Sequence, residues 1–150
     1  MSEFIKLIKQ ITEFGTSSHL AWRDQNGILK KLLVDLYSVY LNLNPVHEET
    51  DDHESPHFDY HEIRKKVESN FPDFGLYSKV LDMHKIVQSP EPAIGDAVDD
   101  LTDIIKDLLA VKWRFENTSE TDALWHFEFL MRNHSEQHLI DLLKYLKESE

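Results

Sequence analysis

The stretch Pro92–Glu116, PAIGDAVDDLTDIIKDLLAVKWRFE, carries the longest uninterrupted helical pattern in the chain. Its apolar residues recur at spacings of three and four, which predicts a helix with one face in the core. That face holds Ile94, Val98, Leu101, Ile105, Leu108, Leu109 and Phe115. The other face carries a row of acidic residues, Asp96, Asp99, Asp100, Asp103 and Asp107. We therefore expect a core helix with an acidic exterior.

The same apolar spacing dominates on both sides of this stretch, while glycine (4) and proline (5) are scarce. We therefore predict an all-α protein, a single antiparallel bundle of five to six helices that forms one domain over residues 1–150. In the first helix, Gly15 and Ser18 are small enough to let a neighbouring helix approach closely. The expected helices run from about Glu3 to Trp22, from the cap Asp24 to Leu43, from the cap Asp59 to Phe71, from Pro72 to Leu81, over Pro92–Glu116, and from Thr118 or Ser119 to Lys147.

Composition excludes several classes of function. The formal charge of −12 argues against nucleic acid or an anionic membrane as a partner, because phosphate groups require a basic surface. The absence of cysteine excludes disulfides, zinc–thiolate sites and cysteine nucleophiles. No stretch approaches the ~20 apolar residues of a membrane-spanning helix, and the N-terminus lacks a secretory signal, so we expect a cytoplasmic protein.

The last predicted helix has two apolar stripes. One stripe contains Leu124, Phe127, Met131, Leu142 and Tyr145, and the other contains Trp125, Phe129, Ile140 and Leu143. A helix that is apolar on two sides is either central in the bundle or covered by a second subunit. The second stripe is therefore a candidate interface, either in a homodimer or with another protein.

Three stretches that together span most of the chain carry a family resemblance. They are LKKLLVDLYSVYLNLNP (Leu29–Pro45), IGDAVDDLTDIIKDL (Ile94–Leu108) and LWHFEFLMRNHSEQHL (Leu124–Leu139). They resemble domain-of-unknown-function family 5063, a group of uncharacterised bacterial proteins. The family carries a D-D-L-A-D-I-Y-x-D-L pattern in the second stretch and H-W-G-x-H-L in the third, where this chain has Ser135 and Glu136 in place of Trp-Gly. The resemblance implies a small all-helical bundle and no assigned activity.

The aspartate row is open to two interpretations. Its spacing projects the carboxylates from one helix face over three turns, an arrangement that can hold Mg²⁺ or Mn²⁺. The alternative, which we favour at this stage, is a solvated or partner-facing surface, because the aspartates lie nearly opposite the apolar face. Asp99, Asp100 and Asp103 are the candidate ligands, and a second acidic helix that would complete such a site is missing from the sequence.

His134 and His138 are spaced i, i+4 on the last helix and can bind Zn, Fe or Ni from one face. They can also be half-buried side chains bonded to backbone or carboxylate groups. If this helix packs beside the acidic one, either histidine could meet Asp99 or Asp103, as a structural contact or as the start of a metal site. A third group is interpreted as a solvated loop that could bind a divalent ion weakly: His47, His53, His57 and His61 with Glu48, Glu49, Asp51, Asp52 and Glu54.

Two hypotheses for function remain. The first is a non-enzymatic protein that acts by association with a partner or with itself. The second is a metal-dependent hydrolase of a phosphorylated small molecule, with Asp99, Asp100 and Asp103 as ligands and His138 as a helper. The sequence contains no nucleophile elbow, phosphate loop or dinucleotide fingerprint, so we predict no catalytic residue and no cofactor other than a divalent metal.

Overall fold

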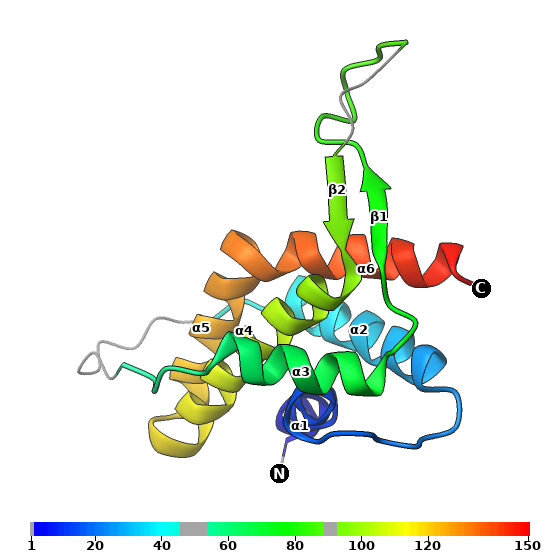
Figure 1. Ribbon diagram of the computed structural model, residues 1–150. Coiled ribbons are helices and arrows are strands. Elements are labelled where there is room, and N and C mark those ends of the chain that lie inside the picture. The colour runs from blue at the N-terminus through cyan, green and yellow to red at the C-terminus, as the bar shows by residue number, and fades with distance from the viewer. Residues whose placement is uncertain (1, 46–53, 89–92) are drawn as a thin grey trace.

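The computed structural model describes residues 2–45, 54–88 and 93–150. In these residues six α-helices and a π-helical segment surround one apolar core, and two short strands form a hairpin that projects from the helical body (Figure 1). The elements are α1 (Glu3–Thr16), α2 (Gln25–Leu41), α3 (Tyr60–Asn70), β1 (Leu76–Lys79), β2 (Ala93–Asp96), α4 (Ala97–Asn117), α5 (Glu120–Leu130), the π-helical segment η1 (Met131–Ser135) and α6 (Glu136–Glu148). The predicted helical class is confirmed.

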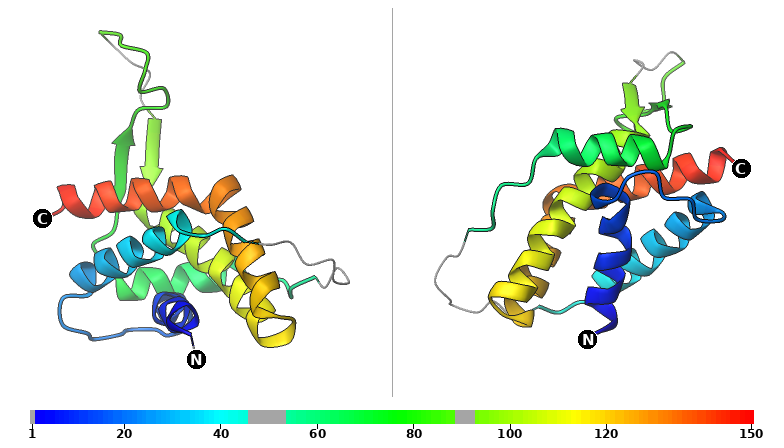
Figure 2. Two further views of the ribbon diagram at one scale, coloured as in Figure 1. Left: turned by 180° about the vertical axis from the view of Figure 1, so that it is seen from behind. Right: turned by 60° about the horizontal axis from the view of Figure 1, so that its bottom comes forward.

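Helix α4 is the central element, because it packs against α1, α3, α5 and α6. Figure 2 shows α1 and α4 side by side, whereas α1 is seen end-on in Figure 1 and so runs across α2, α3 and α6. The helices therefore cross at several angles, and the predicted antiparallel bundle describes the fold only roughly. The acidic stretch begins its helix at Ala97, not at Pro92, and Ile94 is exposed instead of lying in the core.

Helix α1 ends at Thr16, six residues before the predicted end at Trp22. The side-chain amide of Asn70 on α3 explains the early stop. It donates hydrogen bonds to the carbonyls of Phe14 and Ser17 and accepts one from the amide of Leu20. These bonds satisfy backbone groups that a longer helix would have paired internally. Ser18 is therefore exposed beyond the helix, whereas Gly15 lies where α1 meets α3 and α4, as its small size predicts.

The predicted starts of α2 and α3 are confirmed. The Asp24 carboxylate accepts a hydrogen bond from the amide of Gly27, and Asp59 accepts from the amides of His61 and Glu62. Both are N-cap residues, which satisfy amides that have no partner within the helix. Helix α2 ends at Leu41, close to the predicted end at Leu43.

The segment between α3 and α4 corrects the sequence prediction. In place of a helix from Pro72 to Leu81, strand β1 pairs antiparallel with β2, with Leu76 opposite Asp96 and Ser78 opposite Ile94. The four residues Ala93–Asp96 were assigned to the long helix because Ile94 falls in its apolar spacing. In the structure this spacing is incidental, since Asp96 has extended backbone and caps α4.

The C-terminal region also differs from the single helix that we predicted. Helix α5 continues through η1 into α6, and the chain turns a corner there (Figure 1). In η1 the amide of Glu136 bonds to the carbonyl of Met131, five residues back. Such π-helical turns widen a helix locally and are frequent at functional sites. The corner lets α5 pack along the far half of α4 while α6 covers its first half.

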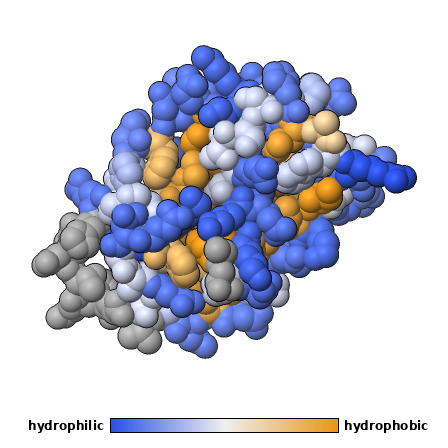
Figure 3. Space-filling view, turned by 90° about the horizontal axis from the view of Figure 1, so that it is seen from below, coloured by the Kyte–Doolittle hydropathy of each residue, from blue (hydrophilic) through white to orange (hydrophobic). Residues whose placement is uncertain are grey.

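The surface away from the hairpin is mainly hydrophilic, with apolar side chains in strips between the charged ones (Figure 3). No helix in the described part of the chain is both long enough and apolar enough to cross a membrane.

Candidate metal centre

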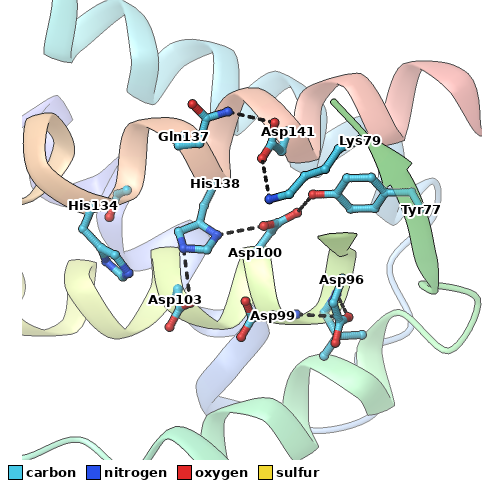
Figure 4. Close-up of polar contacts among 12 residues, drawn as sticks. Tyr77, Lys79, Asp96, Asp99, Asp100, Asp103, His134, Gln137, His138 and Asp141 are labelled. Atoms are coloured by element: carbon cyan, nitrogen blue, oxygen red, sulfur yellow. Dashed lines mark hydrogen bonds and ion pairs between the residues drawn. The ribbon is translucent and has the colours of Figure 1, made fainter. Parts of the chain in front are cut away.

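The aspartate face of α4 is covered by η1 and α6, which present both predicted histidines to it (Figure 4). We call this group the aspartate–histidine cluster: Asp99, Asp100, Asp103, His134 and His138. The interpretation of the aspartates as a solvated face is therefore wrong, most clearly for Asp100, which is 3% exposed. The position of the aspartates opposite the apolar face was misleading because α4 is central, and a central helix packs on more than one side.

Asp100 lies at the base of the cluster. Its Oδ1 is 2.7 Å from Nδ1 of His138, and its Oδ2 accepts a 2.5 Å hydrogen bond from the hydroxyl of Tyr77 on β1. Burial and the bond to Asp100 raise the pKa of Tyr77 far above its usual value, so the phenol stays protonated and remains a donor. A buried carboxylate thus joins α4 to α6 and to the hairpin.

His138 bridges two carboxylates. Its Nε2 lies 3.3 Å from Oδ2 of Asp103, on the opposite side of the ring from Asp100. The hydrogen bond to Asp100 raises the pKa of His138 against the opposing effect of burial. Burial, together with repulsion from Asp99, raises the pKa of Asp103. Because Nδ1 of His138 is occupied by Asp100, Nε2 is the nitrogen that faces the rest of the cluster.

His134 repeats this arrangement one helical turn earlier. Its Nδ1 lies 2.7 Å from Oδ2 of Asp107, which also accepts a 2.6 Å hydrogen bond from the hydroxyl of Ser135. The centroids of the two imidazole rings are 4.9 Å apart, and the ring planes meet at 74°. Ser135 is buried in η1 and helps to hold Asp107. Both histidines therefore have Nδ1 fixed by a carboxylate of α4.

The N-terminal end of the aspartate row is tied to α3. The Tyr60 hydroxyl donates a short hydrogen bond to Asp99, and the Arg64 guanidinium lies 2.8 Å from Asp96. Burial and the Asp99 bond raise the pKa of Tyr60 to about 12. The hydrogen bond to Asp96 raises the pKa of Arg64, which keeps it charged. Asp96 also caps α4, so its role is structural.

Sequence reasoning missed the groups that hold the cluster from outside α4 and α6: Tyr77, which binds Asp100, and Tyr60, which binds Asp99 and accepts a hydrogen bond from Arg64. It also missed Lys79, which lies 3.7 Å from Asp141 beside the cluster. These residues lie in segments that the sequence does not connect to the aspartates, and β1 was predicted as a helix. The tyrosines gave no signal, because each occupies an ordinary apolar position in its local pattern.

The cluster contains two triads of metal-ligating type. One ligand atom each from Asp103, His134 and His138 lie within 4.8 Å of one another, and so do those of Asp99, Asp100 and His138. All five predicted metal ligands are thus brought together. Of the histidine-rich loop, His57 and His61 are exposed and join neither triad, whereas His47, His53, Glu48, Glu49, Asp51 and Asp52 lie outside the described residues.

The four candidate interface residues are only partly exposed. Phe129 is 42% and Ile140 43% exposed, whereas Trp125 and Leu143 are half-buried. The ring of Trp125 stacks on that of Phe129, with centroids 5.5 Å apart. Because η1 turns the chain between them, Phe129 belongs to α5 and Ile140 to α6.

Comparisons with known proteins support both the fold and the family. A crystal structure of protein BF1032 from Bacteroides fragilis is similar to this chain, with a TM-score of 0.70 and 16% identity, covering 99% of this chain and 90% of that chain. At that identity the likeness concerns the fold alone. Among curated proteins no sequence match was found. The model of the family described as Domain of unknown function (DUF5063) matches residues 1–149, and the chain therefore belongs to this family.

Proposed function

We propose that the protein binds a divalent transition-metal ion at the aspartate–histidine cluster, through Asp103, His134 and His138. The supporting observation is the grouping of their ligand atoms within 4.8 Å. Two ligand atoms on one ion, with bonds of about 2.1 Å, stand roughly 3.0–3.5 Å apart. The 3.3 Å separation between Nε2 of His138 and Oδ2 of Asp103 falls in this range.

The surroundings of the histidines support the same proposal. A histidine that ligates a metal usually donates its other ring N–H to a carboxylate, which fixes the tautomer and the ring orientation. Asp100 and Asp107 each occupy Nδ1 of one histidine at 2.7 Å. Mixed imidazole and carboxylate ligands suit Zn²⁺, Mn²⁺, Fe²⁺ or Ni²⁺ better than Ca²⁺. Asp99 stands beside this triad as a further carboxylate.

Isothermal titration calorimetry of the full chain with Zn²⁺, Mn²⁺ and Ni²⁺ tests this proposal. We expect one ion per chain, and at least a ~10–100-fold loss of affinity in His138→Gln and in Asp103→Asn, since even second-sphere changes have effects of that size. His84→Gln and Asp73→Asn are matched controls, because both residues are exposed and lie outside the cluster. Failure of the wild type to bind, or undiminished binding in a variant that combines His138→Gln with Asp103→Asn, would refute the proposal.

Hydrolysis of a phosphorylated small molecule is the reaction class that such a centre would fit, because three protein ligands leave positions open for water and substrate. The half-exposed side chain of His134 leaves that side of the cluster accessible. A cavity of about 360 Å³ is lined by Arg64, Phe74 and Asp96, but none of the five cluster residues lines it. Metal binding is therefore better supported than hydrolysis. Metal-dependent cleavage of p-nitrophenyl phosphate that disappears in His138→Gln would establish the hydrolase.

Association is a second candidate function, favoured by the exposure of Phe129 and Ile140. Large apolar side chains at the surface, when they are grouped, mark interaction sites. If this surface binds a second subunit, the double change Phe129→Ser and Ile140→Ser should shift the chain to a monomer in light scattering. A wild-type chain that is already monomeric would remove this candidate.

A further inference from the structure

The β1–β2 hairpin projects away from the helical body and has two different faces (Figures 1 and 2). On its inner face Tyr77 contacts Tyr145 of α6, with ring centroids 5.6 Å apart, and Lys79 reaches Asp141. On its outer face Leu76 and Ile94 are both 69% exposed. Side chains alternate between the faces of a strand, so Leu76, Ser78 and Ile94 share the outer face.

The chain beyond β1 carries further exposed apolar side chains. We call the exposed set the apolar arm: Leu76, Val80, Leu81, Met83, Ile86, Val87 and Ile94. Their exposed fractions run from 42% for Val87 to 96% for Ile86. The arm contains seven of the twelve large apolar residues that are exposed in the described part of the chain. Apolar side chains are thus concentrated on the element that projects furthest.

The size of the arm matches that of a stable interface. Seven side chains of this type, exposed to this extent, present on the order of 500 Å² of apolar surface. A standard protein interface buries about 800 Å² per partner, of which roughly 60% is apolar, or about 480 Å². The largest apolar patch on a typical monomeric protein is about 300–600 Å², and it is often functional. The arm therefore offers about as much apolar area as one side of such an interface.

Charge indicates what kind of partner the arm accepts. Residues 76–88 contain Lys79 and Lys85 against the single acid Asp82, whereas the whole chain has a formal charge of −12. Two copies would repel through their acidic bodies if these met directly. Contact through the projecting arms keeps the bodies apart, and repulsion between separated charges is screened over about 8–10 Å in ordinary salt. The arm is thus suited to meet a second acidic body at a distance.

We propose that the apolar arm is a self-association surface, which packs against the same arm of a second copy of this chain about a two-fold axis. A two-fold contact brings one patch against itself, and an apolar patch is complementary to itself. The edges of the two-stranded sheet also favour this partner, because unpaired strand edges readily pair with an identical strand. This proposal is independent of metal binding.

Light scattering and sedimentation equilibrium of the metal-free full chain, at concentrations up to roughly 0.1 mM, test the proposal. We expect a dimer whose affinity increases when salt is raised from about 0.05 M to about 0.5 M, because salt screens the repulsion between the bodies. Leu81→Ser with Ile86→Ser should give a monomer. Val34→Ser with Leu41→Ser is the matched control, since both are exposed apolar residues on α2, and it should leave the dimer intact.

Cross-linking provides a second measurement that does not depend on stability. The chain has no cysteine, so a single introduced thiol can bond only to its copy. We expect oxidative dimers from Met83→Cys and none from Val34→Cys. The proposal would be overturned if the wild type stayed monomeric at roughly 0.1 mM, a concentration about a hundred times a micromolar dissociation constant. A dimer that survives the arm changes but dissociates in Phe129→Ser with Ile140→Ser would also overturn it, as would binding of the arm to phosphatidylcholine vesicles without dimer formation.

Discussion

Nδ1 of His138 on α6 lies 2.7 Å from Oδ1 of Asp100 on α4, and Asp100 is 3% exposed. The second carboxylate oxygen accepts the hydroxyl of Tyr77 from the hairpin. One buried carboxylate thus contacts donors from two elements that are separated from it in the chain. A buried charge needs such partners, because an unpaired charge in the interior is strongly destabilising. The bond therefore links the fold, the candidate metal centre and the base of the apolar arm.

Replacing Asp100 by asparagine should test this link. The amide has nearly the same shape, but one of its two polar atoms is a donor, so either Tyr77 or His138 would face a donor instead of an acceptor. We expect a loss of about 1–3 kcal/mol in the free energy of unfolding in urea without metal. In calorimetry we expect roughly a 10–100-fold loss of metal affinity, because His138 is no longer held in its tautomer.

Asp73→Asn is the control for charge, since Asp73 is exposed. The two measurements separate two roles of Asp100. Lower stability with unchanged metal affinity would limit Asp100 to the fold and remove its effect on the metal. Unchanged stability would contradict the structural role itself.

Gly15 lies where α1 approaches α3 and α4 most closely. A Cβ atom at this position would lie 2.8 Å from Cγ2 of both Ile63 and Ile105. Alanine gains up to about 1 kcal/mol of helix propensity over glycine, but overpacking a filled core costs typically about 1–3 kcal/mol. Both contacts are to Cγ2, which is attached directly to a stiff β-branched carbon and cannot easily move away, so the upper half of the overpacking range applies, about 2–3 kcal/mol. We therefore expect Gly15→Ala to lower the free energy of unfolding by about 1–2 kcal/mol, as the difference of these two effects.

Gly75→Ala is the matched comparison, because no atom lies within 4 Å of a Cβ placed there. Its free energy of unfolding should change by no more than about 0.5 kcal/mol. Thermal or urea unfolding of the two variants side by side gives the answer. If Gly15→Ala proved as stable as the wild type, the close packing of these three helices would be contradicted.

Local signals in the sequence were sufficient for several elements. Asp24 and Asp59 precede apolar helical patterns and cap α2 and α3 as predicted, because an N-cap depends only on its own residue and the next three. The small side chain of Gly15 likewise indicated the close helix contact. The histidine pair and the aspartate row were recognised as candidate ligands from their spacing alone.

The remaining features depend on contacts between distant segments. Strand β2 was not predicted from the sequence, because Ile94 fits the helical spacing of the stretch that follows it. The partners of Asp100, Tyr77 and His138, are 23 and 38 residues away in the chain, and no local pattern reports such a distance. The π-helical turn that places Ser135 beside Asp107 also has no sequence signature. It differs from an α-helix only in that a backbone amide bonds to the carbonyl five residues back, not four.

Asp122, at the start of α5, should make stability depend on pH. It is 8% exposed, and burial alone would raise its pKa. The hydrogen bond from Thr118, together with the charges of His126 and Arg114, outweighs this effect and lowers the pKa. The Thr118 hydroxyl is 2.6 Å from the carboxylate and Arg114 is 3.4 Å away. Because the folded pKa is below the unfolded one, the ionised form stabilises the native state.

The sign of the pH dependence follows directly. The contribution of Asp122 is complete above the unfolded pKa of about 3.9 and is lost as the pH falls through the lower pKa of the folded state. We expect Asp122→Asn to destabilise the protein by about 1–3 kcal/mol near neutral pH, and the gap between wild type and variant to narrow as the pH falls below about 4. Glu120→Gln, an exposed change in the same helical turn, is the control, and its free energy of unfolding should stay close to that of the wild type at every pH. Urea unfolding between about pH 2.5 and 6 measures this difference. A gap that stays constant over the range would show that Asp122 acts through shape and hydrogen bonding, not through its charge.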